Sequence, residues 1–283
     1  MANSIVSIDM ALTLNDGRKL GYAEYGISDG KPLFYFHGHS GSRFEARFLA
    51  EQATQAHIRL IGVDRPGMGR SSFKSGRRLL DWPDDLVELA GYLHLDRFAV
   101  VGFSGGGPYA LSCAYKLADR LTACGIVAGV GHTGPLLTFL SQWLPWLVLP
   151  IARRYFRDPE IASTTLTRVA RNWVEPDRRA FASPGVREIM AASLAEALKH
   201  GAKGPAYDGV LLGRSWGFRL EEITLSRLYV WQGELDREVP VTMGRSIVAQ
   251  LLQCQAAFYP GEGHISLIVN HRKEIVTTLV KNE

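Results

Sequence analysis

One short segment of the chain carries the residue types that nucleophilic catalysis requires. Residues 102–106 read Gly-Phe-Ser-Gly-Gly, and they directly follow the apolar run at residues 98–101. A G-x-S-x-G segment between a strand and a helix is typical of a nucleophile elbow, a strained turn that exposes the serine hydroxyl above the strand end. Glycines are needed around the serine because Cβ atoms there would collide with the adjacent strand and helix. We therefore predict that Ser104 is a nucleophile.

An acid and a base follow this serine in the order Ser, Asp, His. A free serine hydroxyl is a weak nucleophile near neutral pH, so an imidazole must accept its proton during attack. Asp236 comes just after the apolar run at residues 228–232, and His264 just after the run at residues 256–259. Both positions lie beyond the carboxyl ends of expected strands, where open α/β sheets form their sites. Glu234 is the competing candidate for the acid, because it lies two residues before Asp236.

These positions resemble those of the α/β-hydrolase-fold serine hydrolases, in the branch of the esterases and proline iminopeptidases. The resemblance covers essentially the whole chain. It implies that His264 is the general base, and that Asp236 fixes the tautomer of the imidazole and stabilises the imidazolium. It also implies an oxyanion hole made by the backbone N–H groups of His39 and Gly105, because an H-G-x turn at residues 37–39 follows an expected strand. Such donors stabilise a tetrahedral oxyanion.

Two further features near this predicted site have alternative roles. His39 carries an imidazole where family members often have an apolar residue, and the side chain would either contact the substrate or, as we expect, be solvated. Residues 64–71 resemble the family's D-x-x-G-x-G-x-S turn and lack the Lys-Ser/Thr ending of a phosphate-binding loop. We expect this turn to support the oxyanion loop, with Arg65 available to hydrogen-bond to it.

The order of the expected elements favours an α/β fold. An antiparallel hairpin is predicted at residues 4–25, because two alternating segments flank a turn whose residues tolerate positive φ. Short apolar runs without polar alternation then predict strands that are covered on both faces; they span residues 32–37, 60–64, 98–103, 124–130, 228–232 and 256–259. Helices are predicted at residues 44–56, 82–93, 108–117, 241–252 and 265–280. The sequence therefore predicts a mostly parallel central sheet with crossover helices and an N-terminal antiparallel hairpin.

One long interval contains no convincing strand. From residue 133 to about residue 226 there are only helical stretches broken by prolines, and a structureless loop of that length is unusual inside a compact domain. We predict a core domain formed by residues 1–132 and 216–283, with a helical lid, or cap, at residues 133–215 over Ser104. Most tryptophans of this region are expected to pack the lid on the core, with one or two lining a pocket; they are Trp143, Trp146, Trp173 and Trp216.

The distribution of charge argues against a nucleic-acid partner. The 283 residues carry a formal net charge of +4, and residues 133–215, with eleven basic and seven acidic side chains, account for the whole excess. Nucleic-acid-binding modules gather Lys and Arg on a recognisable motif, and none is present. The pairs at residues 153–154 and 178–179 are Arg-Arg. They could steer an anionic substrate, although paired arginines on a helix usually form a solvated face.

The rest of the composition predicts a soluble cytoplasmic protein. The chain is 46% hydrophobic and 21% charged, close to globular averages. Its three cysteines form no C-x-x-C pair, which favours buried thiols in a reducing compartment. The first residues lack a signal-peptide pattern, and the longest apolar stretch is about half a membrane span. We expect no stable membrane insertion, no metal and no cofactor, and nothing in the sequence specifies an oligomeric state.

The function expected from these features is hydrolysis of small, largely apolar esters through an acyl-enzyme intermediate. An aminopeptidase of the proline iminopeptidase type and a carbon–carbon bond hydrolase are alternatives on the same triad. The aminopeptidase would need lid carboxylates to hold a free amine; the candidates are Glu160, Glu175, Asp177, Glu188 and Glu196. An alternative of another class is a non-catalytic small-molecule receptor. Such proteins often lose a triad member, whereas this chain keeps all three.

Overall fold

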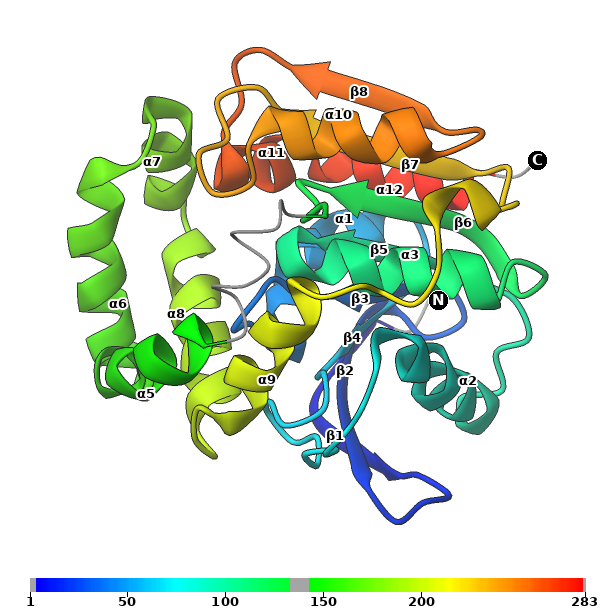
Figure 1. The fold of residues 1–283 in the computed structure, drawn as a ribbon, viewed down its shortest axis with the longest axis horizontal. Coiled ribbons are helices and arrows are strands. Elements are labelled where there is room, and N and C mark those ends of the chain that lie inside the picture. The colour runs from blue at the N-terminus through cyan, green and yellow to red at the C-terminus, as the bar shows by residue number, and fades with distance from the viewer. Residues whose placement is uncertain (1–3, 133–142, 282–283) are drawn as a thin grey trace.

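The structure, a computed structural model, describes residues 4–132 and 143–281 and contains a single eight-stranded sheet within them (Figure 1). The strand order is β1-β2-β4-β3-β5-β6-β7-β8. β1 (Ser4–Thr13) and β2 (Lys19–Ile27) form the predicted hairpin, in which Gly17 adopts a φ of +83°. β2 runs antiparallel to β4, and all later pairs are parallel. The parallel strands are β3 (Lys31–Phe36), β4 (Ile58–Val63), β5 (Phe98–Phe103), β6 (Leu121–Val127), β7 (Leu228–Gly233) and β8 (Gln255–Tyr259).

Helices cover both faces of this sheet. One face carries α2 (Trp82–Tyr92), α3 (Gly107–Lys116) and α10 (Val241–Gln250). The other carries η1 (Arg43–Leu49), α1 (Ala50–Gln55), α11 (His264–Asn270) and α12 (Arg272–Val280). In β3, Phe34 and Phe36 pack against the first layer, whereas Leu33 and Tyr35 pack against the second, and all four are fully buried. This burial on both sides explains why the strands lack polar alternation. The predicted fold class is confirmed.

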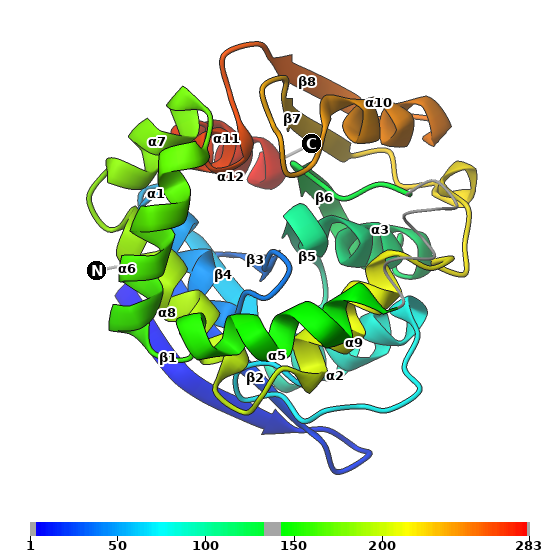
Figure 2. The same cartoon turned by 60° about the vertical axis from the view of Figure 1, so that its left-hand side comes forward.

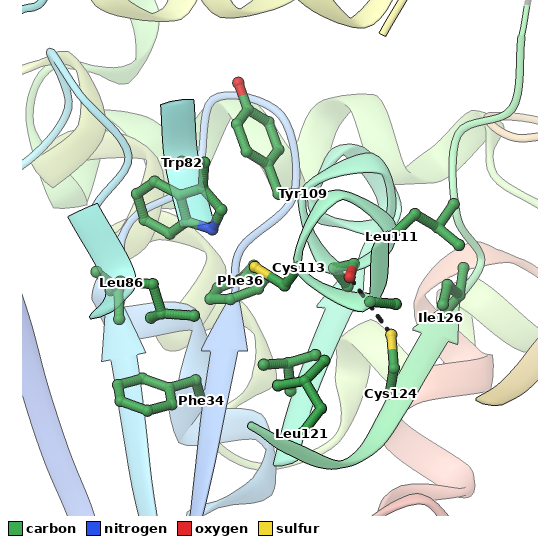
Figure 3. Close-up of a cluster of buried hydrophobic side chains, with 14 of the residues drawn as sticks. Phe34, Phe36, Trp82, Leu86, Tyr109, Leu111, Cys113, Leu121, Cys124 and Ile126 are labelled. Carbon is green, nitrogen blue, oxygen red and sulfur yellow. Dashed lines mark hydrogen bonds between the residues drawn. The ribbon is translucent and has the colours of Figure 1, made fainter. Parts of the chain in front are cut away.

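The layer between the sheet and helices α2 and α3 is aromatic and tightly packed (Figure 3). The ring of Trp82 packs edge-on against Phe36 and Tyr109, with ring centroids 5.3 and 5.7 Å apart. Cys113 and Cys124 are free thiols buried in this layer. Burial raises the pKa of both thiols above the ordinary value, so they remain protonated and act as small apolar side chains.

Two predicted helices differ from the observed ones. The helix expected at residues 44–56 begins as the 3-10 helix η1 and becomes α-helical only at Ala50. The helix expected at residues 265–280 is interrupted at His271, which separates α11 from α12. Side-chain contacts hold this break, because Asn270 donates to the carboxylate of Glu262 and the His271 ring lies between two acidic groups.

The chain leaves the sheet between β6 and β7 and forms a group of helices that we call the cap (residues 144–212). They are α5 (Leu144–Phe156), α6 (Pro159–Val169), α7 (Glu175–Ala182), α8 (Val186–Leu198) and α9 (Lys203–Leu212). No described residue between β6 and β7 is in a strand, as predicted. Helices α5 to α8 lie on the side toward which the arrows of β6 and β8 point (Figures 1 and 2). Residues 133–142 of the predicted lid lie outside the described residues.

A buried carboxylate of the cap, Asp208 on α9, is bonded to two arginines of the core. Its side chain is fully buried, and its oxygens lie 2.9 Å from a guanidinium nitrogen of Arg65 and 2.9 Å from one of Arg77. The hydroxyl of Tyr109 also donates to it. Burial alone would raise the pKa of Asp208, but the charges of the two arginines hold it far below its usual value. The carboxylate is therefore ionised and anchors the cap to the core.

A second anchor joins α8 to the start of η1. Arg43 is 1% exposed and lies with one guanidinium nitrogen between Asp64 at 2.7 Å and Glu196 of the cap at 2.6 Å. Asp64 also accepts hydrogen bonds from the backbone nitrogens of Arg43 and Arg70. We call residues 37–42, between β3 and η1, the first loop. The turn at residues 64–71 is thus tied both to the cap and to η1, which follows the first loop.

Replacing Asp208 with alanine should lower the free energy of unfolding by about 3–5 kcal/mol, because two buried guanidinium groups lose the charge that compensates them. Urea unfolding followed by circular dichroism measures the loss. The matched control is Asp84→Ala, which removes an exposed partner of Lys116 and should cost less than about 1 kcal/mol. Equal losses in the two variants would contradict the anchoring role of Asp208.

Candidate active site

The turn after β5 has the geometry that its sequence predicts. Ser104 has a φ of +52°, a left-handed conformation that is strained for a residue with a side chain. It begins η3 (Ser104–Gly106), which continues directly into α3. A Cβ on Gly102 would lie 2.2 Å from the carbonyl oxygen of Gly106, and a Cβ on Gly106 would lie 2.1 Å from that of Phe36. Only glycine fits at these two positions, so the strained turn and its glycines depend on each other.

Asp236 and His264 are hydrogen-bonded to each other, with 2.7 Å between the Asp236 Oδ2 and the His264 Nδ1. Their exposed fractions are 5% and 2%. The other oxygen of Asp236 accepts hydrogen bonds from the backbone nitrogens of Glu238 and Val239, at 2.9 and 2.8 Å. These bonds hold the carboxylate so that it faces the imidazole, and the imidazole then donates from Nδ1 and leaves Nε2 able to accept.

The competing acid lies elsewhere. Glu234 forms an ion pair with Arg245 at 3.1 Å. Only Leu235 separates it from Asp236, but of the two acids it is Asp236 whose side chain bonds to His264. The geometry therefore favours Asp236 over Glu234 as the partner of the base.

The surroundings of His264 favour its charged form. Burial lowers the pKa of the imidazole, but the hydrogen bond and the charge of Asp236, with a smaller contribution from Glu238, raise it above its ordinary value of 6.5. A carboxylate oxygen of Glu238 lies 3.9 Å from Nε2. A base with this ionisation behaviour accepts a proton readily and stabilises the imidazolium that results.

Ser104 and His264 line the same cavity, whose volume is about 210 Å³. The ring of His264 packs on Phe103, the residue before Ser104, with ring centroids 4.9 Å apart. Apolar side chains of both core and cap line the cavity; they are Phe103, Leu166, Trp173, Met190, Leu194 and Ile265. Its other lining residues include Gly38, His39, Gly41, Glu45, Ser193 and Glu238. The structure thus places the predicted nucleophile and base at one cavity, with Asp236 bonded to His264.

The two predicted oxyanion donors lie next to Ser104. The backbone nitrogen of His39 is 2.9 Å from the point that a Cβ on Gly105 would occupy. A Cβ on Gly38 would lie 3.5 Å from the Cβ of Ser104. Gly105 belongs to the first turn of a helix, where N–H groups have no acceptor within the helix. The backbone of the first loop therefore runs directly beside the nucleophile turn.

Arg65 holds the first loop through hydrogen bonds. Its guanidinium donates to the carbonyl oxygens of His37 and Gly38, and its backbone nitrogen donates to Nε2 of His37. Nδ1 of His37 then donates to the carbonyl of Gly38 at 2.8 Å. Burial and the charge of Arg65 hold the pKa of His37 well below its usual range, which keeps this imidazole neutral. The expected hydrogen bond from Arg65 to the loop is confirmed.

Glu45 is a buried residue of the site that the sequence did not indicate. Its Oε1 accepts hydrogen bonds from the backbone nitrogen of Gly38 at 2.7 Å and from the hydroxyl of Tyr35 at 3.0 Å. Burial raises the pKa of this carboxyl from 4.5 to about 6. No local pattern distinguishes it, because it is a single acid in an amphipathic segment. It fixes the peptide between His37 and Gly38, one residue before His39.

The side chain of His39 is exposed, as expected, but it also contacts the cap. Its Nε2 donates to the carbonyl oxygen of Pro205 on α9, at 2.9 Å. This contact ties the imidazole to α9, so solvation alone does not describe it.

The tryptophans and arginines of the cap have mostly structural surroundings. Trp173 lines the cavity, whereas Trp143 and Trp146 are 63% and 39% exposed and Trp216 is buried in the core. Arg153 donates to the carbonyl oxygen of Leu198 at the end of α8. Among the described residues that line the cavity there is no lysine or arginine. The steering of an anionic substrate into the cavity by Arg153 therefore gains no support.

A larger depression of about 370 Å³ lies at the opposite end of the sheet, beside Lys31 and Thr122 at the amino ends of β3 and β6. Open α/β sheets bind ligands at the carboxyl ends of their strands, so the smaller cavity is the candidate site. Within residues 4–132 and 143–281, no cluster of three or more His, Cys, Asp or Glu side chains is placed to hold a metal. No helix in those ranges could cross a membrane.

Residues 33–278 match the family model described as the alpha/beta hydrolase family. The chain belongs to this family. Among solved structures, a hydrolase from Pseudomonas aeruginosa PA01 is similar to this alpha/beta hydrolase with a TM-score of 0.75 at 21% identity, over 97% of this chain and 98% of the other. An esterase from Thermogutta terrifontis gives a TM-score of 0.71 at 20% identity, over 98% and 96% of the two chains. Likenesses at this identity show a shared fold.

Two other similarities add detail. An enol-lactonase from Burkholderia xenovorans LB400 gives a TM-score of 0.73 at 17% identity, over 96% of this chain and 100% of that chain. A putative 2-succinyl-6-hydroxy-2,4-cyclohexadiene-1-carboxylate synthase from Bacillus subtilis (strain 168) is 30% identical over 115 residues. That match spans 40% of this alpha/beta hydrolase and 41% of the relative, less than half of either chain.

Ionisation of Glu45 should make the stability of this alpha/beta hydrolase depend on pH. Because its pKa is raised to about 6, the contribution of Glu45 to stability is complete below pH 4.5 and is lost as the pH rises through 6. Relative to Glu45→Gln, the wild type should therefore lose about 2 kcal/mol of unfolding free energy between pH 4 and pH 8. Urea unfolding at the two pH values measures this difference. A constant difference would show that Glu45 does not titrate in this range.

Proposed function

We propose that this alpha/beta hydrolase is a serine esterase that cleaves small, largely apolar esters through Ser104, His264 and Asp236. The observation that carries the proposal is one cavity that contains the strained serine and an imidazole bonded through its far nitrogen to a buried carboxylate. That arrangement supplies a nucleophile, a base and an orienting acid, the three roles that acyl transfer to serine requires. Two of the similar solved structures, from Thermogutta terrifontis and a Rhodococcus species, are described as esterases.

The reaction would proceed in two halves. In the first, the Ser104 Oγ attacks the ester carbonyl carbon while Nε2 of His264 accepts the hydroxyl proton, and the N–H groups of His39 and Gly105 bind the oxyanion. The intermediate then collapses: the bond to the alcohol breaks, and His264 gives its proton to the leaving oxygen. In the second half, His264 deprotonates a water molecule that attacks the acyl-enzyme, and the carboxylic acid leaves as Ser104 regains its proton. Asp236 stabilises the imidazolium in both halves.

The lining of the cavity limits the substrate. Its volume of about 210 Å³ is smaller than the roughly 300–1,000 Å³ of sites for drug-sized ligands, and half of the side chains that line it are apolar. Besides the imidazoles of His39 and His264, the ionisable side chains on its wall are the carboxyl groups of Glu45 and Glu238. A substrate that carries its own carboxylate near the ester would be repelled by them. Small uncharged esters therefore fit this cavity best.

The positions of the cap carboxylates favour an ester over a peptide with a free amine. Asp177 and Glu196 are already bonded to the core. The remaining candidates, Glu160, Glu175 and Glu188, do not line the cavity. An aminopeptidase of the proline iminopeptidase type needs cap carboxylates at the amine, and the described cap offers none there.

A fluorophosphonate probe should label the wild type and fail to label Ser104→Ala, because the probe forms a bond to an activated serine oxygen. Labelling is read by intact-protein mass spectrometry. His264→Ala should label far more slowly, since no base remains to accept the proton. Equal labelling of wild type and Ser104→Ala would exclude Ser104 as the nucleophile. A wild type that does not react would instead favour a non-catalytic receptor.

Asp236→Ala should lower kcat for a p-nitrophenyl ester by about 10⁴-fold, because the imidazole loses the group that fixes its tautomer. Glu234→Ala is the matched control and should keep nearly full activity, since Glu234 bonds to Arg245. The opposite result would exchange the roles of the two acids. The same assay with p-nitrophenyl acetate, butyrate and octanoate beside proline β-naphthylamide tests the substrate class. Turnover of the amide above that of every ester would contradict the esterase proposal.

A further inference from the structure

A carboxylate of the cap is bonded to the backbone of the catalytic histidine. Asp177 lies on α7, and its Oδ2 accepts a hydrogen bond from the backbone nitrogen of His264 at 3.0 Å. Its Oδ1 accepts one from the backbone nitrogen of Ser266 at 2.8 Å. The two bonds join residues that are 87 and 89 positions apart in the chain. Asp177 thus binds the backbone of the segment that carries the imidazole and links it to the cap.

The loop before His264 is shaped to receive this carboxylate. A Cβ on Gly263 would lie 2.4 Å from Oδ2 of Asp177, so any larger residue there would displace the carboxylate. The backbone nitrogen of Gly263 is held by the hydroxyl of Ser266 at 2.8 Å. Gly263 therefore leaves room for the Asp177 carboxylate, in addition to its place in the loop after β8.

Asp177 acts from outside the reaction cavity. It is 5% exposed and is not among the residues that line the cavity, so it does not touch a substrate. Both of its oxygens are used by backbone donors of the core, and a charge-assisted bond to a backbone N–H is among the stronger hydrogen bonds of proteins. Helix α7 packs on α11 around this contact. The cap therefore bears directly on the position of the imidazole.

The charge of Asp177 also reaches the imidazole. Four carboxyl groups face His264: Asp236 and Glu238 from the segment after β7, Glu45 from η1 and Asp177 from the cap. Asp236 is the strongest of the influences that raise the pKa of His264, and Asp177 adds a smaller one in the same direction. A change in the charge of Asp177 should therefore be visible in the titration of His264.

We propose that Asp177 is a positioning residue of the catalytic machinery, which fixes the backbone of His264 to the cap and so sets the place of the imidazole beside Ser104. This inference rests on the proposed role of His264 as the general base. It gives a role to α7, which contributes no lining residue to the cavity: the docked cap completes the alignment of the base. Asp177, one of the cap acids considered for binding a substrate amine, would instead position His264.

The test uses Asp177→Asn, which keeps the shape of the side chain but has one oxygen instead of two and no charge. One of the two backbone donors then loses its acceptor. We expect kcat for p-nitrophenyl acetate to fall by about 10- to 100-fold with a much smaller change in KM, because small displacements of a catalytic group act on the chemical step. The acid limb of the kcat/KM profile should move to lower pH, since the imidazolium loses a neighbouring negative charge.

The matched control is Glu175→Gln on the same helix. Glu175 is exposed and pairs with Arg179, so this variant makes the same change of charge without touching the His264 segment. It should leave kcat and the acid limb as in the wild type. Gly263→Ala is the complementary variant, because it displaces the carboxylate sterically and keeps its charge. It should lower kcat while the acid limb moves less than in Asp177→Asn.

A second readout does not require turnover. In the Ser104→Ala background, the proton on Nδ1 of His264 gives a downfield NMR resonance that follows the ionisation of the imidazole. Adding Asp177→Asn should lower the pH at which this resonance titrates. An unchanged titration, with or without a fall in melting temperature, would overturn the proposal and leave Asp177 a purely structural contact. If the wild type proves inactive on every ester, the esterase proposal fails, while this titration still reports whether Asp177 acts on His264.

Discussion

The geometry of the site depends on one fully buried ion pair, that of Arg65 with Asp208. Burying two charged groups away from water costs free energy unless each has several hydrogen-bonding partners, and here each does. The Arg65 guanidinium also donates hydrogen bonds to carbonyl oxygens of the first loop, and Asp208 also binds Arg77 and Tyr109. In this pair the two buried charges compensate each other. The pair also holds the loop that carries His39 and fastens α9 to the core.

The side chains of the proposed triad are consequently positioned by two kinds of constraint. Ser104 is held locally, because its strained backbone and the glycines around it leave one conformation for the turn. His264 and the first loop are held by carboxylates of other segments. Asp236 binds the imidazole of His264 and Asp177 its backbone. Glu45 binds the loop directly, and Asp208 acts on it through Arg65. The cap belongs to the second kind. It supplies a wall of the cavity and also several of the acceptors on which the core elements rest.

This division explains how much could be predicted from the sequence. The sheet, the hairpin, the helical insertion and the turn at Ser104 follow from local rules: apolar runs, turn residues, and glycines where no Cβ fits. Asp236 and His264 were indicated because they directly follow strands. Glu45 and Asp208 were not indicated, because no local pattern distinguishes either acid, and Asp177 was named only as one of five cap acids that could hold a substrate amine. The partners of Asp177 and Asp208 lie at least 87 positions away in the chain, and only the folded structure brings them together. Those of Glu45, Gly38 and Tyr35, are near in the chain, but the contact depends on how the segment after β3 turns back.

The anchors of the cap also have a consequence for folding. The bonds of Asp177, Glu196 and Asp208 to the core close loops of 87, 153 and 143 residues. Contacts of such separation require the chain to lose the entropy of closing those loops. The sheet itself contains a pairing of this kind, since Cys124 of β6 lies opposite Leu228 of β7. Local undocking of the cap would therefore remove Asp177 and Asp208 from the segments that carry His264 and His39, even where the sheet keeps its own hydrogen bonds.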